Sequence, residues 1–187
     1  MFIQTEATPN PNALKFLPGR EIMGSEKPKF YRKDGVGNPA ERSPLAESLF
    51  EVEGVEEVFF GQDFITVGKK ASIEWPILKT PILSSISSFF MSDDNATVII
   101  SNKEDNKSKD DLDEVTEQII SLLDTRVRPA VAMDGGDIIF HSYAEGVVYL
   151  ELHGACSGCP SSTATLKMGI ENMLKHYIPE VRRVEAI

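Results

Sequence analysis

The sequence has few cysteines, no long hydrophobic run and no excess of positive charge. Its 187 residues include two cysteines, and 19 basic against 29 acidic side chains give a formal net charge of −10. Two cysteines exclude a secreted scaffold held together by several disulfides. The acidic balance repels phosphate groups, so we expect no binding to nucleic acid or to anionic membrane surfaces. No apolar stretch approaches the roughly 20 residues that span a bilayer, so we also expect no membrane segment.

The composition is typical of a folded protein in a reducing compartment. Hydrophobic residues make up 41% and charged residues 26% of the chain, which excludes a mostly disordered, collagen-like or coiled-coil protein. The first residues resemble neither a secretory signal nor an arginine-rich transit peptide. We therefore expect a cytoplasmic protein, in which thiols stay reduced unless they bind metal or take part in redox chemistry.

A stretch without apolar side chains divides the chain in two. Residues 101–110 are entirely polar or charged, so they cannot help to bury a core, and we predict a flexible charged linker. The predicted domains cover residues 1–100 and 111–187, and each is just large enough for its own core. The second is the more acidic, with 6 basic and 12 acidic side chains against 10 and 14 in the first.

In the first domain, apolar alternation predicts strands over residues 2–6, 13–17, 55–60, 64–67 and 97–100. Residues 20–43 are rich in glycine, proline and charge, and we expect a long loop there. Ser43 and Pro44 predict the start of a helix. The apolar spacing over residues 75–90 predicts another helix, which Pro81 would kink or shorten.

In the second domain, apolar residues at helical spacing begin at Leu112, and Pro129 is expected to close this helix. A turn at residues 134–137 precedes strands over 137–143 and 147–153. A helix over 161–177 and a strand over 181–186 follow. The predicted order is α-β-β-α-β, and the predicted fold class is an α/β (α+β) protein of two small domains.

Both cysteines lie in one tetrapeptide, Cys156-Ser157-Gly158-Cys159, between a predicted strand and a predicted helix. The N–H groups at a helix start favour thiolates, and the spacing brings both sulfurs within reach of one metal centre. A zinc or iron–sulfur site normally takes four ligands. One chain supplies two, with only His153 nearby, so a two-fold dimer would complete the set.

Other uses of the two thiols remain open at this point. Cys156 as nucleophile and Cys159 as resolving thiol would make a thiol–disulfide oxidoreductase, although the tryptophan and the βαβ pattern of thioredoxin-like motifs are missing. A regulatory local disulfide, a structural dimer bridged by zinc and two incidental cysteines are the further alternatives.

The second half resembles the NifU-like C-terminal domain of Nfu-type iron–sulfur scaffold and carrier proteins. The matching segments, read from the sequence, are Arg128-Pro129-Ala130-Val131, Asp134-Gly135-Gly136-Asp137-Ile138, Leu152-His153-Gly154-Ala155-Cys156-Ser157-Gly158-Cys159-Pro160, Thr165-Leu166-Lys167, Gly169-Ile170-Glu171 and Ile178-Pro179-Glu180-Val181. The first half resembles the N-terminal domain of mitochondrial-type and related bacterial members. It matches at Thr8-Pro9-Asn10-Pro11-Asn12, Ser43-Pro44-Leu45-Ala46 and Phe59-Phe60-Gly61-Gln62-Asp63-Phe64.

The resemblance implies a carrier rather than an enzyme. It implies that Cys156 and Cys159 bind a [4Fe-4S] cluster that bridges two protomers of a homodimer on an exposed loop. It also implies upstream assembly proteins as donors and, as acceptors, apo-proteins such as lipoyl synthase, aconitase-type dehydratases or respiratory subunits. The expected compartment is then the bacterial cytoplasm, or the mitochondrial matrix for a mature eukaryotic form.

Overall fold

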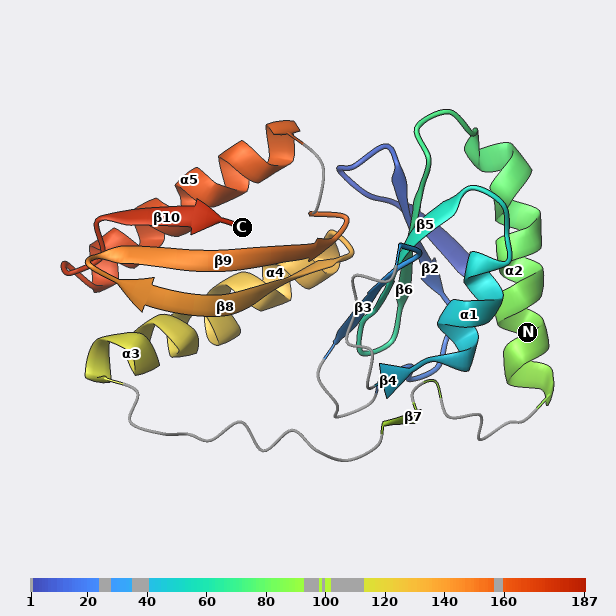
Figure 1. Ribbon diagram of the computed structural model, residues 1–187, viewed down its shortest axis with the longest axis horizontal. Coiled ribbons are helices and arrows are strands. Elements are labelled where there is room, and N and C mark those ends of the chain that lie inside the picture. Colours follow the sequence, from blue (N-terminus) through green and yellow to red (C-terminus); the bar gives the residue numbers. More distant parts are fainter. Residues whose placement is uncertain are drawn as a thin grey trace. The chain divides into compact units, whose positions relative to one another are not determined.

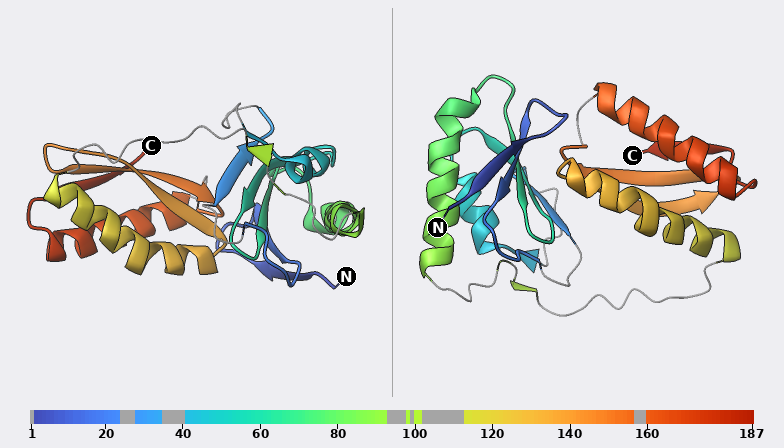
Figure 2. Two further views of the ribbon diagram at one scale, coloured as in Figure 1. Left: turned by 90° about the horizontal axis from the view of Figure 1, so that it is seen from below. Right: turned by 180° about the vertical axis from the view of Figure 1, so that it is seen from behind.

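The computed structural model describes residues 2–23, 28–34, 41–92, 98, 100–101, 113–156 and 160–187, leaving aside the side chains at 41–42, 100–101 and 160–162. The chain divides into two compact units, Met1–Glu104 and Asp105–Ile187, and Figures 1 and 2 show the ribbon of each. Both units combine helices with sheets, which confirms the predicted α+β class. The predicted linker over residues 101–110 lies, apart from Ser101, outside the described residues.

Unit 1 is an antiparallel sheet with two helices on one of its faces (Figure 1). The strand order is β1-β2-β6-β5-β3. The strands of this sheet are β1 Gln4–Ala7, β2 Ala13–Leu17, β3 Lys29–Arg32, β5 Val55–Phe60 and β6 Ile65–Lys69. The two helices that cover it are α1 Pro44–Phe50 and α2 Trp75–Ser92. Two short strands, β4 (Glu41–Arg42) and β7 (Ile100–Ser101), pair separately.

The core of unit 1 lies between the sheet and the two helices. Phe16 and Ile65 from the strands, Leu49 from α1 and Ile82 and Ile86 from α2 are all 0% exposed and belong to one apolar cluster. Because successive strand residues alternate between faces, this face of the sheet is filled by every second side chain.

Three sequence-based expectations for unit 1 need correction. The first strand lies at Gln4–Ala7 and not at residues 2–6. The segment predicted as a loop, 20–43, contains β3 and β4, because β3 pairs with the edge of β5, where Phe30 lies opposite Phe59. Pro81 does not shorten α2: it lies on the exposed side, where water can replace the hydrogen bond that a proline cannot donate.

Unit 2 has the predicted order α-β-β-α-β. The elements are α3 Glu114–Leu122, a π-helical turn Leu123–Val127, α4 Arg128–Met133, β8 Gly136–Ala144, β9 Val147–Gly154, α5 Pro160–Tyr177 and β10 Arg183–Ala186. β8 pairs with β9 antiparallel, and β10 adds to β9 in parallel. Buried apolar residues of all these elements, among them Ile119, Val148 and Leu174 at 0% exposure, form the core.

The first helix of unit 2 does not close at Pro129, as the sequence suggested. The N–H group of Arg128 donates to the Leu123 carbonyl, five residues back, so a π-helical turn precedes α4. Pro129 is then in the first turn of α4, where its missing N–H group leaves no bond unmade. The helix continues to Met133, and this extension carries the chain to the turn before β8.

Ser43 offers a test of the start of α1. It is 2% exposed, and its Oγ accepts from the Ala46 N–H group at 3.1 Å and donates to the Val98 carbonyl at 2.6 Å. Ser43→Ala leaves both partners without this bond, and we expect it to lower the free energy of unfolding of unit 1 by about 1–2 kcal/mol. Urea denaturation followed by the fluorescence of Trp75, the one tryptophan in the sequence, measures the change. The exposed Ser72→Ala is the matched control and should change stability by less than about 0.5 kcal/mol. Equal stabilities of the two variants would contradict the cap.

Candidate metal centre

The predicted ligand loop joins β9 to α5. β9 ends at Gly154, Ala155 and Cys156 follow in a turn, and α5 begins at Pro160. This confirms the position between a strand and a helix. Cys156 belongs to the described residues, whereas Cys159, the other predicted ligand, is one of residues 157–159, which lie outside them.

Cys156 is buried, which corrects the expectation of an exposed loop at this residue. It is 7% exposed and belongs to the apolar core cluster of unit 2. A Cβ atom built on Gly136 would lie 2.8 Å from the Cys156 Sγ atom, so the sulfur points towards the first residue of β8. The burial comes from a contact between segments twenty residues apart, which local sequence patterns do not reveal.

Two described hydrogen bonds hold the backbone around Cys156. The Ala155 N–H group donates to the Gly135 carbonyl at 3.1 Å, and the Thr163 hydroxyl donates to the Cys156 carbonyl at 3.2 Å. The first bond ties the loop to the turn before β8, and the second ties it to the first turns of α5. The Thr163 hydroxyl thus reaches back from α5 across the loop.

The two glycines of the Asp-Gly-Gly-Asp motif have different roles. Gly135 has a φ angle of 80°, which favours glycine in the turn. Gly136 is opposite Gly154 in the β8–β9 ladder, and a side chain there would lie 2.7 Å from the His153 carbonyl oxygen. The sequence predicted a turn at residues 134–137, but it did not reveal that Gly136 makes room for Cys156.

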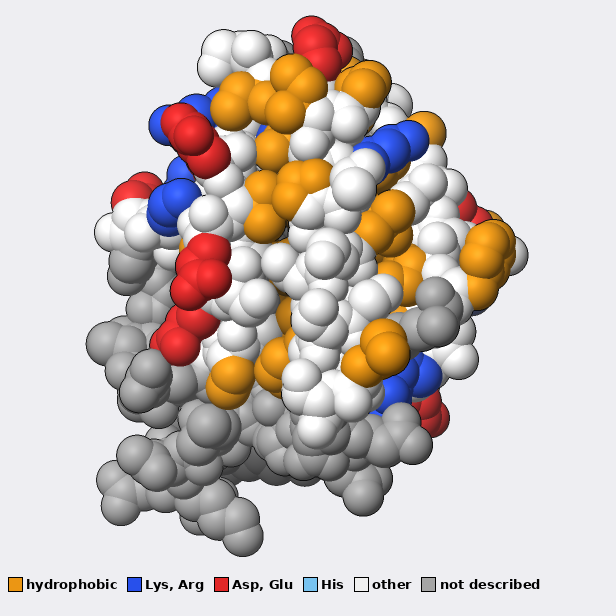
Figure 3. All heavy atoms as spheres, turned by 90° about the vertical axis from the view of Figure 1, so that its right-hand side faces the viewer, with side chains coloured by type: hydrophobic (Ala, Val, Ile, Leu, Met, Phe, Trp, Pro, Cys, Tyr) orange, Lys and Arg blue, Asp and Glu red, His pale blue; other side chains and the backbone are white. Residues whose placement is uncertain are grey.

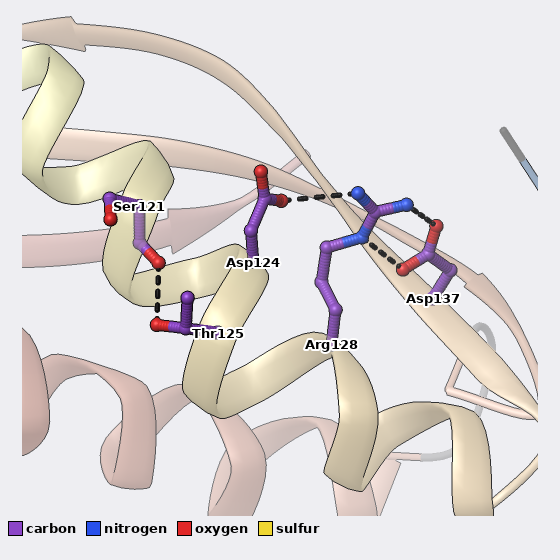
Figure 4. A network of polar contacts seen from close by, with 5 residues as sticks. All are labelled: Ser121, Asp124, Thr125, Arg128 and Asp137. Atoms are coloured by element: carbon purple, nitrogen blue, oxygen red, sulfur yellow. Dashed lines mark hydrogen bonds and ion pairs between the residues drawn. The ribbon is translucent and has the colours of Figure 1, made fainter.

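Asp137, the last residue of this motif, is bound by Arg128. The Arg128 Nε and one terminal nitrogen donate to the two carboxylate oxygens at 2.8 and 2.7 Å, while the other terminal nitrogen donates to Asp124 at 3.1 Å. Figure 4 shows Arg128 reaching from the helix to the strand, with Asp124 on the preceding turn. Asp137 is 4% exposed. Its carboxylate therefore anchors β8 to α4 and is not available as an open ligand.

The electrostatics of this pair favour the charged form of the Arg128 guanidinium. The hydrogen bond to Asp137 is the main cause that raises the pKa of Arg128 above its ordinary value, against the opposing effect of partial burial. A two-bonded arginine–carboxylate fork is among the stronger polar contacts in proteins. The network makes the turn before β8 a fixed support for the cysteine loop.

The histidines in the described part of unit 2 make other contacts. His153 is 8% exposed and its Nε2 lies 3.3 Å from a Glu151 oxygen, His141 contacts Ser142, and His176 packs edge-on against Tyr177. Among the described residues, no three His, Cys, Asp or Glu side chains form a group that could hold a metal ion.

Within the described part of the chain, no helix combines the length and apolar character needed to cross a membrane.

The fold and the loop define a two-unit α+β protein with paired thiols between a strand and a helix. Two family models match it: "Scaffold protein Nfu/NifU N terminal" over residues 3–93 and "NifU-like domain" over residues 119–185. The chain belongs to the Nfu-type family, with the N-terminal domain followed by the NifU-like domain.

Curated relatives match over the whole chain. It is 50% identical over 187 residues to the proteins of Drosophila persimilis and Drosophila willistoni named "NFU1 iron-sulfur cluster scaffold homolog, mitochondrial". These matches cover 100% of this chain and 65% and 64% of those proteins, so the chain spans slightly less than two thirds of their length. Among solved structures, a NifU-like protein from Saccharomyces cerevisiae is 28% identical, with a TM-score of 0.45 over 56% of this chain and 87% of that one.

The contact between Gly136 and Cys156 predicts a sharp effect of one methyl group. Gly136→Ala places a Cβ against two backbone atoms, the His153 oxygen at 2.7 Å and the Cys156 nitrogen at 3.2 Å, and against Sγ at 2.8 Å. We expect a loss of about 1–3 kcal/mol of stability, because backbone cannot move aside cheaply, and faster alkylation of the Cys156 thiol. Gly169→Ala in α5 is the control: it has no atom within 4 Å of the new Cβ and should stabilise the helix by up to about 1 kcal/mol. Urea denaturation and timed alkylation measure both, and an unaffected Gly136→Ala protein would contradict the contact.

The Arg128 fork gives a second prediction for this site. Arg128→Lys keeps the charge but cannot make two parallel bonds to Asp137, and we expect it to lower the free energy of unfolding of unit 2 by about 1.5–3 kcal/mol. The same change at Arg126 is the control, since that guanidinium lies 5.0 Å from the Tyr177 ring, a contact that lysine can also make. Denaturation followed by circular dichroism separates them. If both substitutions have the same small effect, the fork does not anchor the turn.

Proposed function

We propose that this chain carries an iron–sulfur cluster on Cys156 and Cys159 and passes it to apo-proteins. The cluster is cargo rather than a permanent part of the protein, and the chain performs no chemical conversion of its own. The form of the cargo is [4Fe-4S], bound between two copies that supply two thiolates each.

The observation that carries this proposal is the position of a two-thiol loop inside the domain matched as NifU-like. The loop is held against a rigid turn, and the described residues around Cys156 offer no further group of metal ligands. A chain with two cysteines supplies half of a four-thiolate site. The names of the curated relatives include iron–sulfur cluster scaffold, and they lend no support to the oxidoreductase alternative.

Loading requires Cys156 to turn away from Gly136. On the side of α5, this movement is opposed by the hydrogen bond from the Thr163 hydroxyl to the Cys156 carbonyl. A hydrogen bond of this kind contributes about 0.5–1.5 kcal/mol to stability. That is small against the binding of a cluster by thiolates. We infer that the buried position protects the thiol between deliveries and that loading exposes it.

The expected partners and compartment follow from the same proposal. Apo iron–sulfur proteins are the acceptors, upstream iron–sulfur assembly proteins are the donors, and two loaded copies form the homodimer. The relatives are named mitochondrial, so we place the chain in the mitochondrial matrix; they do not support the bacterial cytoplasm as its compartment.

Anaerobic reconstitution with iron and sulfide tests the proposal. We expect about four iron and four sulfide ions per pair of chains, with the absorption and Mössbauer signature of a [4Fe-4S] cluster. Cys156→Ser and Cys159→Ser should each abolish stable loading, because each removes two of the four ligands from the pair. His141→Ala, at an exposed histidine of the same strand pair, is the control and should load fully.

Transfer completes the test. The loaded protein should activate an apo-dehydratase of the aconitase type in the presence of an iron chelator, faster than free iron and sulfide do. Loading that survives either cysteine substitution would show that the ligands are wrong. One zinc ion per pair of chains with no sulfide would show that the protein is a structural zinc-bridged dimer and not a carrier. Turnover of a disulfide substrate without iron would show that it is a thiol–disulfide oxidoreductase.

A further inference from the structure

The backbone around Cys156 is held from two sides by hydrogen bonds of different kinds. On the sheet side, the Ala155 N–H group donates to the Gly135 carbonyl at 3.1 Å, in the turn that the Arg128 fork supports. On the helix side, the Thr163 hydroxyl donates to the Cys156 carbonyl at 3.2 Å. The first bond joins two backbone segments, whereas the second depends on a single side chain.

These two bonds fix what we call the closed position of Cys156, with its thiol in the core of unit 2 against Gly136. In this position the residue is 7% exposed and belongs to the apolar cluster. Because the peptide group before it and its own carbonyl are both held, the residue does not turn out of the core as a whole while both bonds exist. Binding of cargo between two copies requires an accessible thiol, so one of the two bonds has to break first.

The bond from Thr163 breaks at the lower cost. Breaking the sheet-side bond would also disturb the ladder beside it, where Gly136 lies opposite Gly154. The Thr163 hydroxyl is only partly buried and lies close to the start of α5, so water can replace its carbonyl partner. A hydrogen bond of this kind changes an equilibrium by a factor of about 2–12.

We propose that Thr163 is a positioning residue that favours the closed position of Cys156 and so promotes release of the cargo. The inference rests on the proposed function. The closed position competes with the cargo for the same thiol, so a copy binds only during the fraction of time in which it is open. Because two copies share one cluster, the effect of Thr163 on the loading equilibrium is squared. The competition lets a carrier give up a cargo that thiolates alone would hold firmly.

Release is an exchange of ligands in which no electron is transferred. The bond between iron and the Cys156 sulfur breaks, and the thiolate keeps the electron pair and takes a proton from solvent as it returns to the closed position. A thiol of the acceptor loses its proton to solvent and donates an electron pair to the vacated position on the iron. The Thr163 hydroxyl then binds the Cys156 carbonyl again and keeps the displaced ligand away from the cluster.

Alkylation of the iron-free, reduced chain tests the closed position without any cluster. A Cys159→Ser background leaves Cys156 as the one thiol of the sequence, and its rate of reaction with iodoacetamide reports how often it is exposed. Thr163→Val keeps the shape of the side chain but removes the hydroxyl, and it should speed alkylation by about 2- to 12-fold. Thr163→Ser retains the hydroxyl and should keep the rate of the background chain.

Two controls make the same substitution elsewhere. Thr125→Val also removes a hydroxyl bond, the one to the Ser121 carbonyl at 2.7 Å, but in the π-helical turn before α4 (Figure 4). Thr80→Val changes an exposed position of α2 in unit 1, a helix on the side of the molecule that Figure 3 shows. Neither control should change the alkylation rate. An unchanged rate in Thr163→Val, or a Thr163→Ser chain as fast as Thr163→Val, would overturn the proposal.

Retention of the cluster tests the effect on release. In the chain with both cysteines, loss of the cluster to an iron chelator should be at least about twofold slower in Thr163→Val than in the unsubstituted protein, and Thr163→Ser should restore the original rate. A side chain that merely supports the loop would give the opposite result, because its loss would loosen the site. Equal or faster loss from Thr163→Val would therefore overturn the proposal. Failure of the unsubstituted protein to load would instead contradict the proposed function, and it is recognised separately because alkylation needs no iron.

Discussion

Unit 2 depends on the ion pair between Arg128 and Asp137. A carboxylate that is 4% exposed would be strongly destabilising without a partner, and the guanidinium supplies two parallel hydrogen bonds to it. The pair joins the start of α4 to the start of β8 and so fixes the turn between them. That turn receives the Ala155 N–H group and leaves room at Gly136 for Cys156. The position of the thiol therefore rests on a chain of contacts that begins at Arg128.

The same contacts suit a protein that has to hold cargo and then release it. A complete set of four thiolates inside one chain would bind metal firmly and give it up slowly. Under the proposed function, two thiols per chain, with Cys156 held against the core until loading, would make binding depend on a second copy. On the α5 side, the Cys156 backbone is restrained by the hydrogen bond from the Thr163 hydroxyl to the Cys156 carbonyl. A hydrogen bond of this kind can break at low cost when the loop moves.

Much of the fold can be predicted from local patterns, because it follows from local chemistry. The alternation of Ala13–Leu17 and the capping residue Ser43 fix their elements, and the structure has them at those positions. The misses come from contacts between distant segments. β3 is a strand because the edge of β5 pairs with it, and Pro129 does not end its helix because a π-helical turn precedes it.

The candidate site divides in the same way. The strand-to-helix position of the cysteine loop is a local property, and the sequence predicts it. The burial of Cys156 depends on Gly136 across the sheet, and the fork depends on Arg128 and Asp137, nine residues apart. Neither can be read from spacing.

Native mass spectrometry of the anaerobically reconstituted protein tests the central claim most directly, because it counts the chains that hold each cluster. The account predicts that every ion that carries a [4Fe-4S] cluster contains two chains, and that removing the cluster with a chelator returns single chains. A cluster retained by a single chain would contradict the shared site, and with it the explanation of why two cysteines are enough.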